Sequence, residues 1–332
     1  MSFAPEVLQR ANARLRQRRE QNAAEYARRR ERIYSQLPRV RAIDRQLRQT
    51  VVQAAGAALR KGVDPAPAIA ALREQNLGLQ QERAQLLAQL KCPPDYLEEK
   101  PVCPQCGDRG WIGSRMCECL KALCSEEQAK QLSSLLDLKG QSFQTFQLDY
   151  YGPAYSNERQ QMEMVYNVCR RYAREFSHCP IRNLFLTGRP GLGKTFLSAC
   201  IAREVTAQGF SVVYDTAIHI FAQFESARFG RAPDAEESTR RYLNCDLLIL
   251  DDLGSEFNTP FVQSCLYQIL NSRLVAGRRT IISSNLTVQE IRRLYSAQAA
   301  SRIEGEFQML EFCGTDIRLQ KARQKHFQKR GE

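Results

Sequence analysis

The 332-residue sequence predicts an α/β fold, a parallel β-sheet flanked by helices, preceded by an α-helical hairpin or coiled-coil region and a small cysteine-rich module. Short apolar strands alternate with helical stretches from about residue 143 onward, which is typical of parallel sheets. The composition changes near residue 92 and again near residue 141. We therefore expect three parts: residues 1–91, residues 92–140 and residues 141–332.

The first part is rich in Arg, Gln, Ala and Glu and poor in aromatic residues. Its apolar residues recur at helical spacing, first at Ile33, Leu37, Val40, Ile43, Leu47 and Val51 and then at Ile69, Leu72, Leu79, Leu86 and Leu90. Gly62 to Pro65 separates the two runs, and Pro38 is expected to kink or end an earlier helix. Because two such helices bury little apolar surface, we expect this hairpin to dock a partner protein, or alternatively to space or oligomerise the domain that follows.

Two close pairs of cysteines in the second part predict a metal site. Cys103 and Cys106 form a C-x-x-C pair, and Cys117 and Cys119 follow ten residues later, with glycines for turns in between. Four thiolates suit a tetrahedral Zn²⁺ with no open position, which indicates a structural role. Redox chemistry is the alternative for C-x-x-C, but no thioredoxin-like pattern surrounds it. Two flanking cysteines, Cys92 and Cys124, stay open as replacements for Cys117 or Cys119.

The remaining cysteines and the charge place the chain among cytoplasmic proteins. Six cysteines outside the cluster are expected to be small buried apolar residues: Cys169, Cys179, Cys200, Cys245, Cys265 and Cys313. No signal peptide and no long apolar run is visible, so we expect neither secretion nor a membrane. The formal net charge of +12 favours contact with polyanions such as nucleic acid, although a merely well-solvated surface is the alternative.

The third part reads as alternating strands and helices. Strands are predicted at 182–187, 210–214, 246–250 and 280–284, and helices at 195–208 and 260–275. Thr287 and Glu290 have the capping-box spacing, which predicts a further helix start. No internal repeat is visible.

A glycine-rich loop joins the first of these strands to the first helix. It reads Gly188-Arg189-Pro190-Gly191-Leu192-Gly193-Lys194-Thr195 and matches G-x-x-x-x-G-K-[ST]. In such a loop, backbone N–H groups surround phosphates, the Lys194 ammonium neutralises β- and γ-phosphate oxygens, and the Thr195 hydroxyl ligates Mg²⁺. A chance glycine-rich turn is the alternative, but the position between strand and helix favours a site for ATP and Mg²⁺.

Two further strands end in polar residues that complete such a site. Asp251 and Asp252 follow four apolar residues. Asp251 is expected to hold Mg²⁺, usually through water, and Asp252 is expected to orient or activate the attacking water. Alone, this pair would more often be a helix cap or turn. Asn285 ends the next strand and could reach the γ-phosphate or its water, the role called sensor 1 in AAA+ ATPases, or be an ordinary turn residue.

Together these segments resemble the DnaC/DnaI family of bacterial helicase loaders, AAA+ P-loop ATPases related to the replication initiator and to the transposition helper IstB. The resemblance rests on Ser142-Phe143-Gln144-Thr145-Phe146, Gly188 to Thr195, Asp246 to Gly254, Thr280 to Thr287, and the cysteine module with Gly110-Trp111-Ile112. The cysteine module beneath a helical region favours the loaders over IstB, which resembles the ATPase part alone.

The resemblance implies partners and further site residues. It implies that the ATP-bound protein associates with a hexameric DnaB-type helicase through its N-terminal region, contacts single-stranded DNA with the AAA+ domain, and self-associates in a ring or spiral. Arg302 resembles the arginine finger that completes a neighbouring subunit's site, and Arg318 resembles a sensor 2 arginine; an ordinary solvated arginine is the alternative for each. Asp252 departs from the Glu common in AAA+ proteins, so slow hydrolysis is expected.

We therefore expect an ATP-dependent loader of the replicative helicase onto single-stranded DNA in the initiation of DNA replication. The alternatives are an IstB-like transposition helper or phage replication ATPase that acts on a recombinase or initiator, and a non-catalytic DNA-bound scaffold that senses nucleotide. The sequence leaves open the identity of the partner, ring opening against ring assembly, a chromosomal against a mobile-element role, and the number of subunits.

Overall fold

The structure is a computed structural model that describes residues 3–58, 66–136, 138, 140–230 and 235–328. The break expected at residues 62–65 lies outside the described residues. The chain divides into two compact units. We call Ala13–Cys117 the helical unit, and Met1–Asn12 with Glu118–Glu332 the sheet unit.

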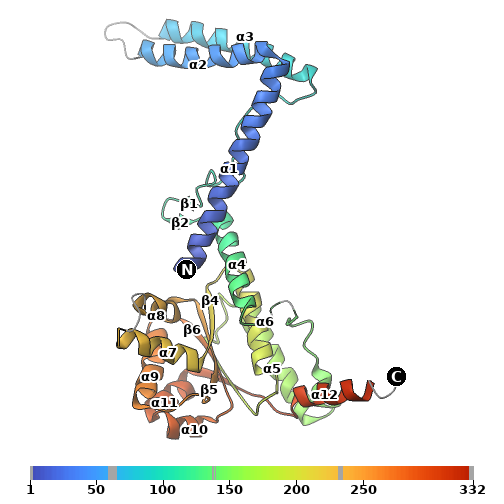
Figure 1. Cartoon of the computed structure of the whole chain (residues 1–332), viewed down its shortest axis with the longest axis vertical. Coiled ribbons are helices and arrows are strands. Elements are labelled where there is room, and N and C mark those ends of the chain that lie inside the picture. Colours follow the sequence, from blue (N-terminus) through green and yellow to red (C-terminus); the bar gives the residue numbers. More distant parts are fainter. Residues whose placement is uncertain (1–2, 59–65, 137, 139, 231–234, 329–332) are drawn as a thin grey trace. The chain divides into compact units, whose positions relative to one another are not determined.

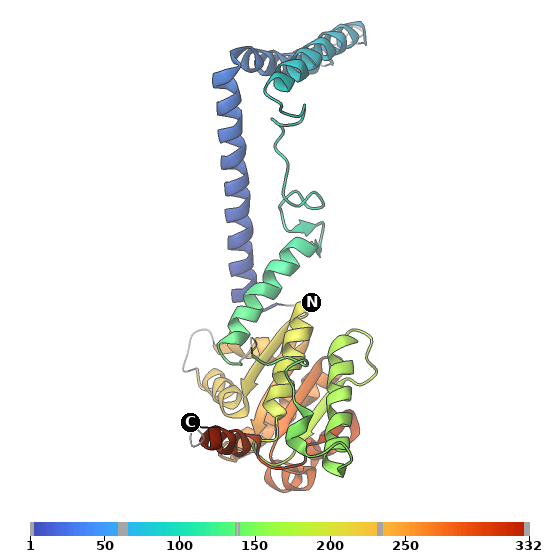
Figure 2. The same ribbon diagram turned by 90° about the vertical axis from the view of Figure 1, so that its right-hand side faces the viewer.

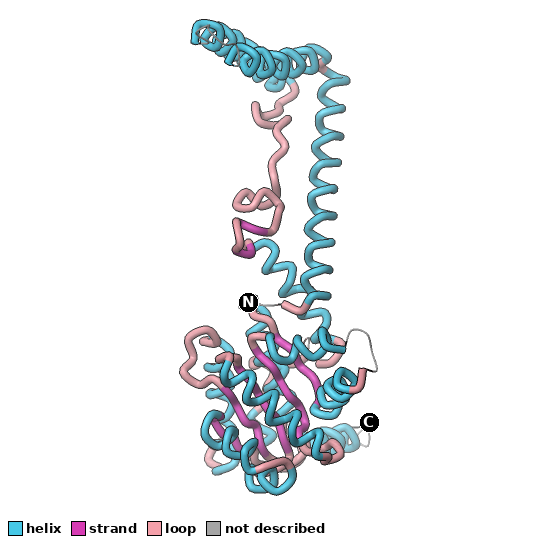
Figure 3. Tube along the Cα trace, turned by 90° about the vertical axis from the view of Figure 1, so that its left-hand side faces the viewer, coloured by secondary structure: helices cyan, strands magenta, loops and turns pink. Residues whose placement is uncertain are grey.

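The sheet unit contains a five-stranded parallel sheet in the order β4-β5-β6-β3-β7. The strands are β3 (Asn183–Thr187), β4 (Val212–Thr216), β5 (Leu247–Leu253), β6 (Arg279–Ser284) and β7 (Phe307–Glu311). Figure 3 shows these strands running side by side between helices. Most of their side chains are apolar and buried because helices cover both faces. The predicted parallel sheet flanked by helices is confirmed.

Each face of the sheet has its own layer of helices (Figure 1). One face packs against α5 (Asn157–Arg174) and α6 (Lys194–Ala207), which lie side by side in Figure 2, and α4 (Glu118–Ser133) packs beside α6. The opposite layer consists of α7 (Ala217–Arg228), α8 (Ala235–Asn244), α9 (Pro260–Val275), α10 (Val288–Leu294) and α11 (Ala297–Glu306). A short 3-10 helix, η1 (Leu148–Tyr151), precedes α5, and α12 (Ile317–Gln328) follows β7.

Two strand boundaries differ from the prediction for local reasons. β4 begins two residues late because Phe210 still belongs to the exit from α6: its N–H donates to Val205 O (3.4 Å) and its ring packs on Phe176 (4.9 Å between centroids). β5 continues through Asp252, where the register with β6 shifts and φ is 57°. The predicted capping box is confirmed, with Thr287 as the N-cap of α10.

The helical unit contains the long helices of the N-terminal region, the first of them from Ala13 onward. α1 (Pro5–Gln36) ends just before Pro38, which starts α2 (Pro38–Ala58), as expected for a proline that ends one helix and opens the next. α2 packs side by side with α3 (Ala66–Gln89), so the predicted hairpin consists of these two helices (Figure 1). A two-stranded antiparallel ribbon, β1 (Trp111–Ile112) and β2 (Arg115–Met116), follows in the cysteine-rich module.

The seam of the hairpin is more polar than its predicted apolar stripe. Arg83 Nε donates to Asp44 Oδ1 (2.8 Å), and Thr50 Oγ1 donates to Asn76 Oδ1 (2.7 Å). Leu87 is the fully buried leucine of α3, with Leu86 beside it only partly buried. Three members of the predicted stripe are exposed instead: Val51, Ile69 and Leu90. The predicted apolar runs therefore supply only part of the contact face, because hydrogen-bonded and charged pairs occupy the rest.

No helix among the described residues is both long and apolar enough to span a membrane.

Candidate nucleotide site and cysteine cluster

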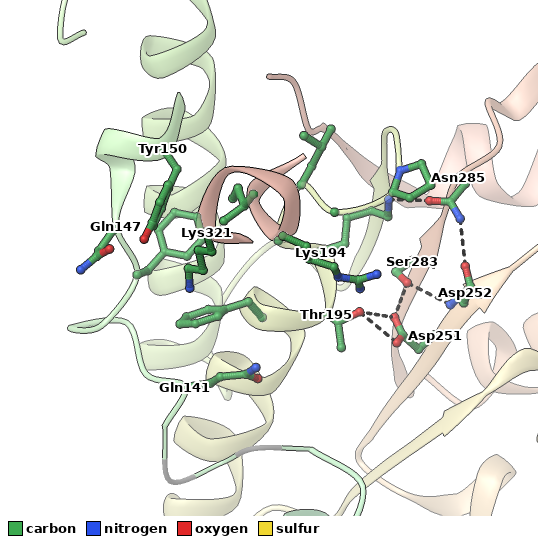
Figure 4. A pocket seen from close by; sticks show the side chains of 18 of the residues that line it. Gln141, Gln147, Tyr150, Lys194, Thr195, Asp251, Asp252, Ser283, Asn285 and Lys321 are labelled. Atoms are coloured by element: carbon green, nitrogen blue, oxygen red, sulfur yellow. Dashed lines mark hydrogen bonds between the residues drawn. The ribbon is translucent and has the colours of Figure 1, made fainter. Parts of the chain in front are cut away.

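A pocket of about 590 Å³ lies at the carboxyl ends of the parallel strands (Figure 4). It brings together most residues of the predicted site: Pro190, Gly191, Leu192, Gly193, Lys194, Thr195, Asp251, Asp252, Asn285 and Arg318. Gly188, Arg189 and Arg302 do not line it. The loop after β3, the end of β5 and the end of β6 thus converge on one cavity, as parallel strands with neighbouring carboxyl ends allow.

The glycines of the loop are required by its close packing. Gly191 has φ 77°, and a Cβ built there would lie 2.1 Å from Asp316 Oδ1. Gly191 O also accepts a hydrogen bond from Ile317 N at the start of α12 (3.0 Å). On the other side of the loop, Tyr151 OH donates to Leu192 O (2.8 Å). The loop is therefore held from both sides, and a side chain at position 191 would displace Asp316.

Lys194 lies inside the curl of the loop and points to the end of β6. Its Nζ donates to Gly188 O (2.5 Å), Arg189 O (2.9 Å) and Asn285 Oδ1 (2.8 Å). Burial lowers the pKa of Lys194 to about 8, and the nearby carboxylates of Asp252 and Asp251 offset part of this effect. The ammonium stays protonated at neutral pH and is positioned to counter phosphate charge.

Asp251 and Thr195 form an oxygen-rich corner that could hold Mg²⁺. Thr195 Oγ1 donates to Asp251 Oδ2 (3.1 Å), and Asp251 is almost fully buried. Tyr214 OH donates to the same carboxylate (2.6 Å), and Ser283 Oγ donates to Oδ1. Hydroxyl and carboxylate oxygens are the ligands that Mg²⁺ prefers, so the donor set fits this ion.

Tyr214 and Ser283 are site residues that the sequence analysis missed. Burial raises the pKa of the Tyr214 hydroxyl, and the adjacent Asp251 carboxylate raises it further, so Tyr214 stays a neutral donor. Both residues lie on strands that neighbour β5, and their pairing with Asp251 depends on the strand order β4-β5-β6. An apolar strand pattern carries no signal for that order.

Asn285 links Lys194 to Asp252. Its Nδ2 donates to Asp252 Oδ1 (3.0 Å) while its Oδ1 accepts from Lys194. Asp252 adopts a left-handed backbone conformation, and its N–H donates to Ser283 Oγ (3.0 Å). This conformation is strained for a residue with a Cβ, and it occurs where the register of β5 with β6 shifts. The Asp252 carboxylate lines the pocket beside Asn285.

The two predicted arginines occupy different places. Arg318 lies on the first turn of α12, lines the pocket and contributes to the lowered pKa of Lys194. Arg302 lies on α11, where its Nη2 donates to Asn271 Oδ1 on α9 (3.0 Å).

The other side of the pocket is lined by aromatic and amide side chains. Figure 4 shows Gln141, Gln147, Tyr150 and Lys321 on the side opposite Asp251, Asp252 and Asn285. Phe146 and Phe196 also line the pocket, and their ring centroids are 5.5 Å apart. Lys321 Nζ lies 5.2 Å from the centroid of the Tyr150 ring. Sequence reasoning used the segment from Ser142 to Phe146 as a family signature and assigned no role to it.

Four cysteines form a cluster that fits a metal ion. The Sγ atoms of Cys103, Cys106, Cys117 and Cys119 all lie within 4.8 Å of one another. A tetrahedral Zn²⁺ with bonds of about 2.3 Å to sulfur would separate its sulfur ligands by about 3.8 Å. The sulfurs of Cys103 and Cys117 are 3.7 Å apart, in agreement with that geometry. The four cysteines could therefore hold Zn²⁺, which would supply structural cross-linking.

Backbone hydrogen bonds and one carboxylate shape the cluster. Gly110 N donates to Cys106 Sγ (3.3 Å), the type of N–H···S contact that supports a metal-bound thiolate. Asp108 is buried and accepts from Val102 N (2.7 Å) and Cys103 N (2.8 Å), a contribution that the sequence analysis missed.

The cysteines outside the cluster differ in burial. Cys124 is fully buried, and burial raises its pKa to about 11, while Cys92 is only partly buried. Five of the six scattered cysteines are buried as expected, and Cys313 is half-buried.

Comparisons with known proteins agree with this description. Residues 176–323 match the family model described as IstB-like ATP binding protein. The chain is 26% identical over 153 residues to the replicative helicase loader DnaC of Escherichia coli (strain K12), across 45% of this chain and 62% of the relative. It is 23% identical over 186 residues to DnaC of Buchnera aphidicola subsp. Acyrthosiphon pisum, across 55% of this chain and 74% of the relative.

A similar solved structure is the crystal structure of the DnaC helicase loader, with a TM-score of 0.42 and 19% identity over 52% of this chain and 98% of that chain. By sequence, residues 176–323 are thus similar to IstB-like ATP binding proteins, in a chain that also carries a four-cysteine cluster.

Proposed function

We propose that the protein is an ATPase that loads a DnaB-type replicative helicase onto single-stranded DNA. The observation that carries this proposal is the meeting of Lys194, Thr195, Asp251, Asp252 and Asn285 in one pocket. The similarity to replicative helicase loaders supports the choice of partner. Because the match spans 62% of the length of the first of these relatives, the whole activity, its DNA and its helicase partner belong to the proposal.

In the proposed reaction, the loop from Gly188 to Thr195 binds the phosphates of ATP. Thr195 and Asp251 would hold Mg²⁺, which would neutralise phosphate charge when bound. Lys194 stabilises the charge on the γ-phosphate, and Asp252 accepts a proton from the attacking water while Asn285 orients it. The direct link from Asn285 to both Lys194 and Asp252 supports this division of roles.

The two arginines complete the proposed catalytic set from different chains. Arg318 lines the pocket of its own chain and would act there. Arg302 lies outside that pocket on α11, which supports a role across a subunit boundary in a ring or spiral of ATP-bound copies. Such an arrangement makes hydrolysis depend on assembly.

The remaining parts of the chain fit the same proposal. Residues 1–91 would dock the helicase, residues 92–140 would form a zinc-binding module and linker, and residues 141–332 would form the ATPase domain. The net charge of +12 supports binding to the phosphates of single-stranded DNA. A loader of this kind would act in the cytoplasm.

The test is loading of the purified cognate helicase onto single-stranded DNA, with and without ATP. Wild type should capture the helicase with ATP and deliver it to DNA, where unwinding of a forked substrate reports loading. Asp252→Asn should bind ATP but lose turnover, while Lys194→Ala should lose most ATP binding and so fail earlier. Equal ATP affinity in wild type and Lys194→Ala would contradict the assigned nucleotide site. Failure of wild type to bind the helicase under any nucleotide condition would contradict the loader.

The match to the IstB-like family model supports one other function, a transposition or phage-replication ATPase that acts on a recombinase or initiator. The same purified protein distinguishes the two. Co-purification with a transposase or initiator, together with no capture of the replicative helicase, would favour this second function.

A further inference from the structure

The carboxylate of Asp251 is fixed from both neighbouring strands. Tyr214 OH on β4 donates to its Oδ2 atom (2.6 Å), and Ser283 Oγ on β6 donates to its Oδ1 atom. The terminal torsion of an aspartate is soft, so it does not by itself determine how the carboxylate is turned. Because each oxygen has a donor from a different strand, the two hydroxyl groups together determine that orientation.

Tyr214 lies behind the carboxylate and not in the pocket. Thr195, Asp251 and Ser283 line the pocket, whereas Tyr214 does not. The Tyr214 side chain is buried in the core on the face of the sheet that α5 and α6 cover. Its hydroxyl therefore acts on the site through Asp251, and we call it a positioning residue for that reason.

The hydrogen bonds leave Asp251 little capacity for a further ligand. Thr195 Oγ1 donates mainly to Oδ2, at 3.1 Å against 3.5 Å to Oδ1 (Figure 4). Tyr214 and Thr195 thus occupy both lone pairs of Oδ2, and Ser283 occupies one of the two on Oδ1. The direction of the remaining lone pair depends on how the carboxylate is turned. Mg²⁺ demands near-ideal octahedral geometry, so this direction matters for an ion held by Thr195 and Asp251, directly or through water.

We propose that Tyr214 is a positioning residue for Mg²⁺, because its hydroxyl holds Asp251 in the orientation that lets Asp251 and Thr195 face the same ion. This inference rests on the proposed nucleotide site. Without the hydroxyl, the carboxylate is anchored on one side only and can turn. Loss of a hydrogen bond that orients a metal ligand typically weakens metal binding about 10- to 100-fold.

The test measures the ATP affinity of the full-length protein as a function of free Mg²⁺, without a chelator that would also remove metal from the cysteine cluster. Wild type should bind ATP more tightly as Mg²⁺ rises. In Tyr214→Phe, the Mg²⁺ concentration that gives half of this increase should be roughly tenfold higher. ATP affinity in the absence of Mg²⁺ should stay the same, because Lys194 and the phosphate loop are unchanged.

Tyr242→Phe is the matched control. Tyr242 is fully buried, and its OH donates to Oδ2 of the buried Asp215 (2.8 Å), the residue that follows Tyr214 on β4. The substitution removes the same kind of bond, from a phenol to a buried carboxylate, at a distance from Asp251 in the hydrogen-bond network. It should keep the wild-type Mg²⁺ titration, even where it lowers the melting temperature as much as Tyr214→Phe does.

A second set of variants tests whether Tyr214 acts through Asp251. Asp251→Asn should itself raise the Mg²⁺ requirement, and the addition of Tyr214→Phe should raise it no further, because the effects of two residues that act as a unit do not add. Ser283→Ala removes the donor to the other carboxylate oxygen and should shift the titration in the same direction as Tyr214→Phe. It gives the readout if Tyr214→Phe does not fold.

The outcomes separate the role of Tyr214 from the site on which it rests. Absence of ATP binding by wild type would contradict the proposed nucleotide site, and ATP binding that is independent of Mg²⁺ would contradict the metal corner; each would also overturn this inference. With wild type behaving as expected, three results would overturn the role of Tyr214 alone. These are an unshifted titration in folded Tyr214→Phe (or, if it does not fold, in Ser283→Ala), an equal shift in Tyr242→Phe, and a further shift when Tyr214→Phe is added to Asp251→Asn.

Discussion

The interactions that stabilise the sheet unit internally differ in kind from those that stabilise the helical unit. In the sheet unit, consecutive strand residues such as those at 247–250 are fully buried between two helical layers. In the helical unit, one apolar cluster at the base of the hairpin contains the buried residues Ile33, Tyr34, Val40, Leu87 and Leu97. Polar pairs in the hairpin seam add to this cluster, and three of the four clustered cysteines, Cys103, Cys106 and Cys117, belong to the same unit.

This difference predicts different sensitivities. Apolar burial is non-directional and nearly independent of salt, pH and metal. Metal bonds and buried ion pairs depend on geometry and on the ionisation of their partners. Conditions that leave the sheet unit intact should therefore disorder parts of the helical unit.

The largest expected effect is the loss of metal from the cysteine cluster. Zinc held by four thiolates can contribute about 10–16 kcal/mol to the folding of a small module. Removal of Zn²⁺ by a chelator, or the substitution Cys103→Ser, should abolish hydrogen-exchange protection at residues 103–117 and leave that of β3 and β5 unchanged. Cys92→Ser is the matched control, since Cys92 lies outside the cluster. Protein purified without chelator that contains no zinc would contradict the prediction.

The second expected effect is on ATP hydrolysis, which we predict to require an arginine from a second copy of the chain. Arg302→Ala should bind ATP normally and hydrolyse it roughly 10³-fold more slowly, because an arginine finger of this type stabilises the departing γ-phosphate. Mixing Arg302→Ala with Lys194→Ala should restore part of the turnover, since an intact site can then meet an intact arginine. Continued inactivity in mixtures that demonstrably co-assemble would show that Arg302 does not act across subunits.

The third effect compares two ion pairs within the hairpin. Arg83→Met leaves the largely buried Asp44 without its cation, and we expect the free energy of unfolding of the hairpin to fall by roughly 1–3 kcal/mol. Arg39→Met breaks the exposed pair with Glu82 and should have little measurable effect, because solvent screens that pair. Hydrogen exchange of α2 and α3 amides measures both. If both substitutions lowered the free energy of unfolding equally, the buried pair in the seam would be no more important for stability than the exposed pair.

The smallest effect is a pH dependence confined to the sheet unit. Burial lowers the pKa of Lys194 to about 8, so the side chain loses its proton above that pH. Bound phosphate favours the charged form, so ATP affinity should fall by up to about tenfold per pH unit above pH 8, with proton uptake on binding. Calorimetry in buffers of different ionisation enthalpy measures this uptake. Lys194→Arg, which stays charged, should show none.

The same lowered pKa has the opposite effect on stability. Between pH 8 and the ordinary value of 10.5, the unfolded chain keeps a proton that folded Lys194 has lost, so the free energy of unfolding rises with pH over this window.

The sequence predicted the parts of the molecule that depend on local pattern. Strand-loop-helix order placed the loop from Gly188 to Thr195 correctly, and Thr287 was recognised as a helix start from its spacing to Glu290. Features that depend on which strands are neighbours were missed. Tyr214 and Ser283 contact Asp251 only because β4 and β6 flank β5, and no local signal encodes that arrangement.

The hairpin shows a second limit of pattern reading. The apolar spacing predicted that Leu90 lies in the contact between the helices, but Leu87 is the buried residue and Leu90 is exposed. Part of the contact face is instead occupied by Arg83 and Asn76, which bond to polar partners on α2. From sequence alone, a polar residue between two helices is predicted to be solvent-exposed, because its partner on the other helix is not known.

The contact between Gly191 and Asp316 has a mechanical consequence. The Asp316 carboxylate fills the space beside Gly191, and the Gly191 carbonyl holds the first N–H of α12. The phosphate loop and α12 are therefore in direct contact, and a displacement of α12 would have to move the loop or break this contact. Because α12 also carries Arg318 and Lys321, which line the pocket, we expect such a displacement to change the pocket at both of these positions.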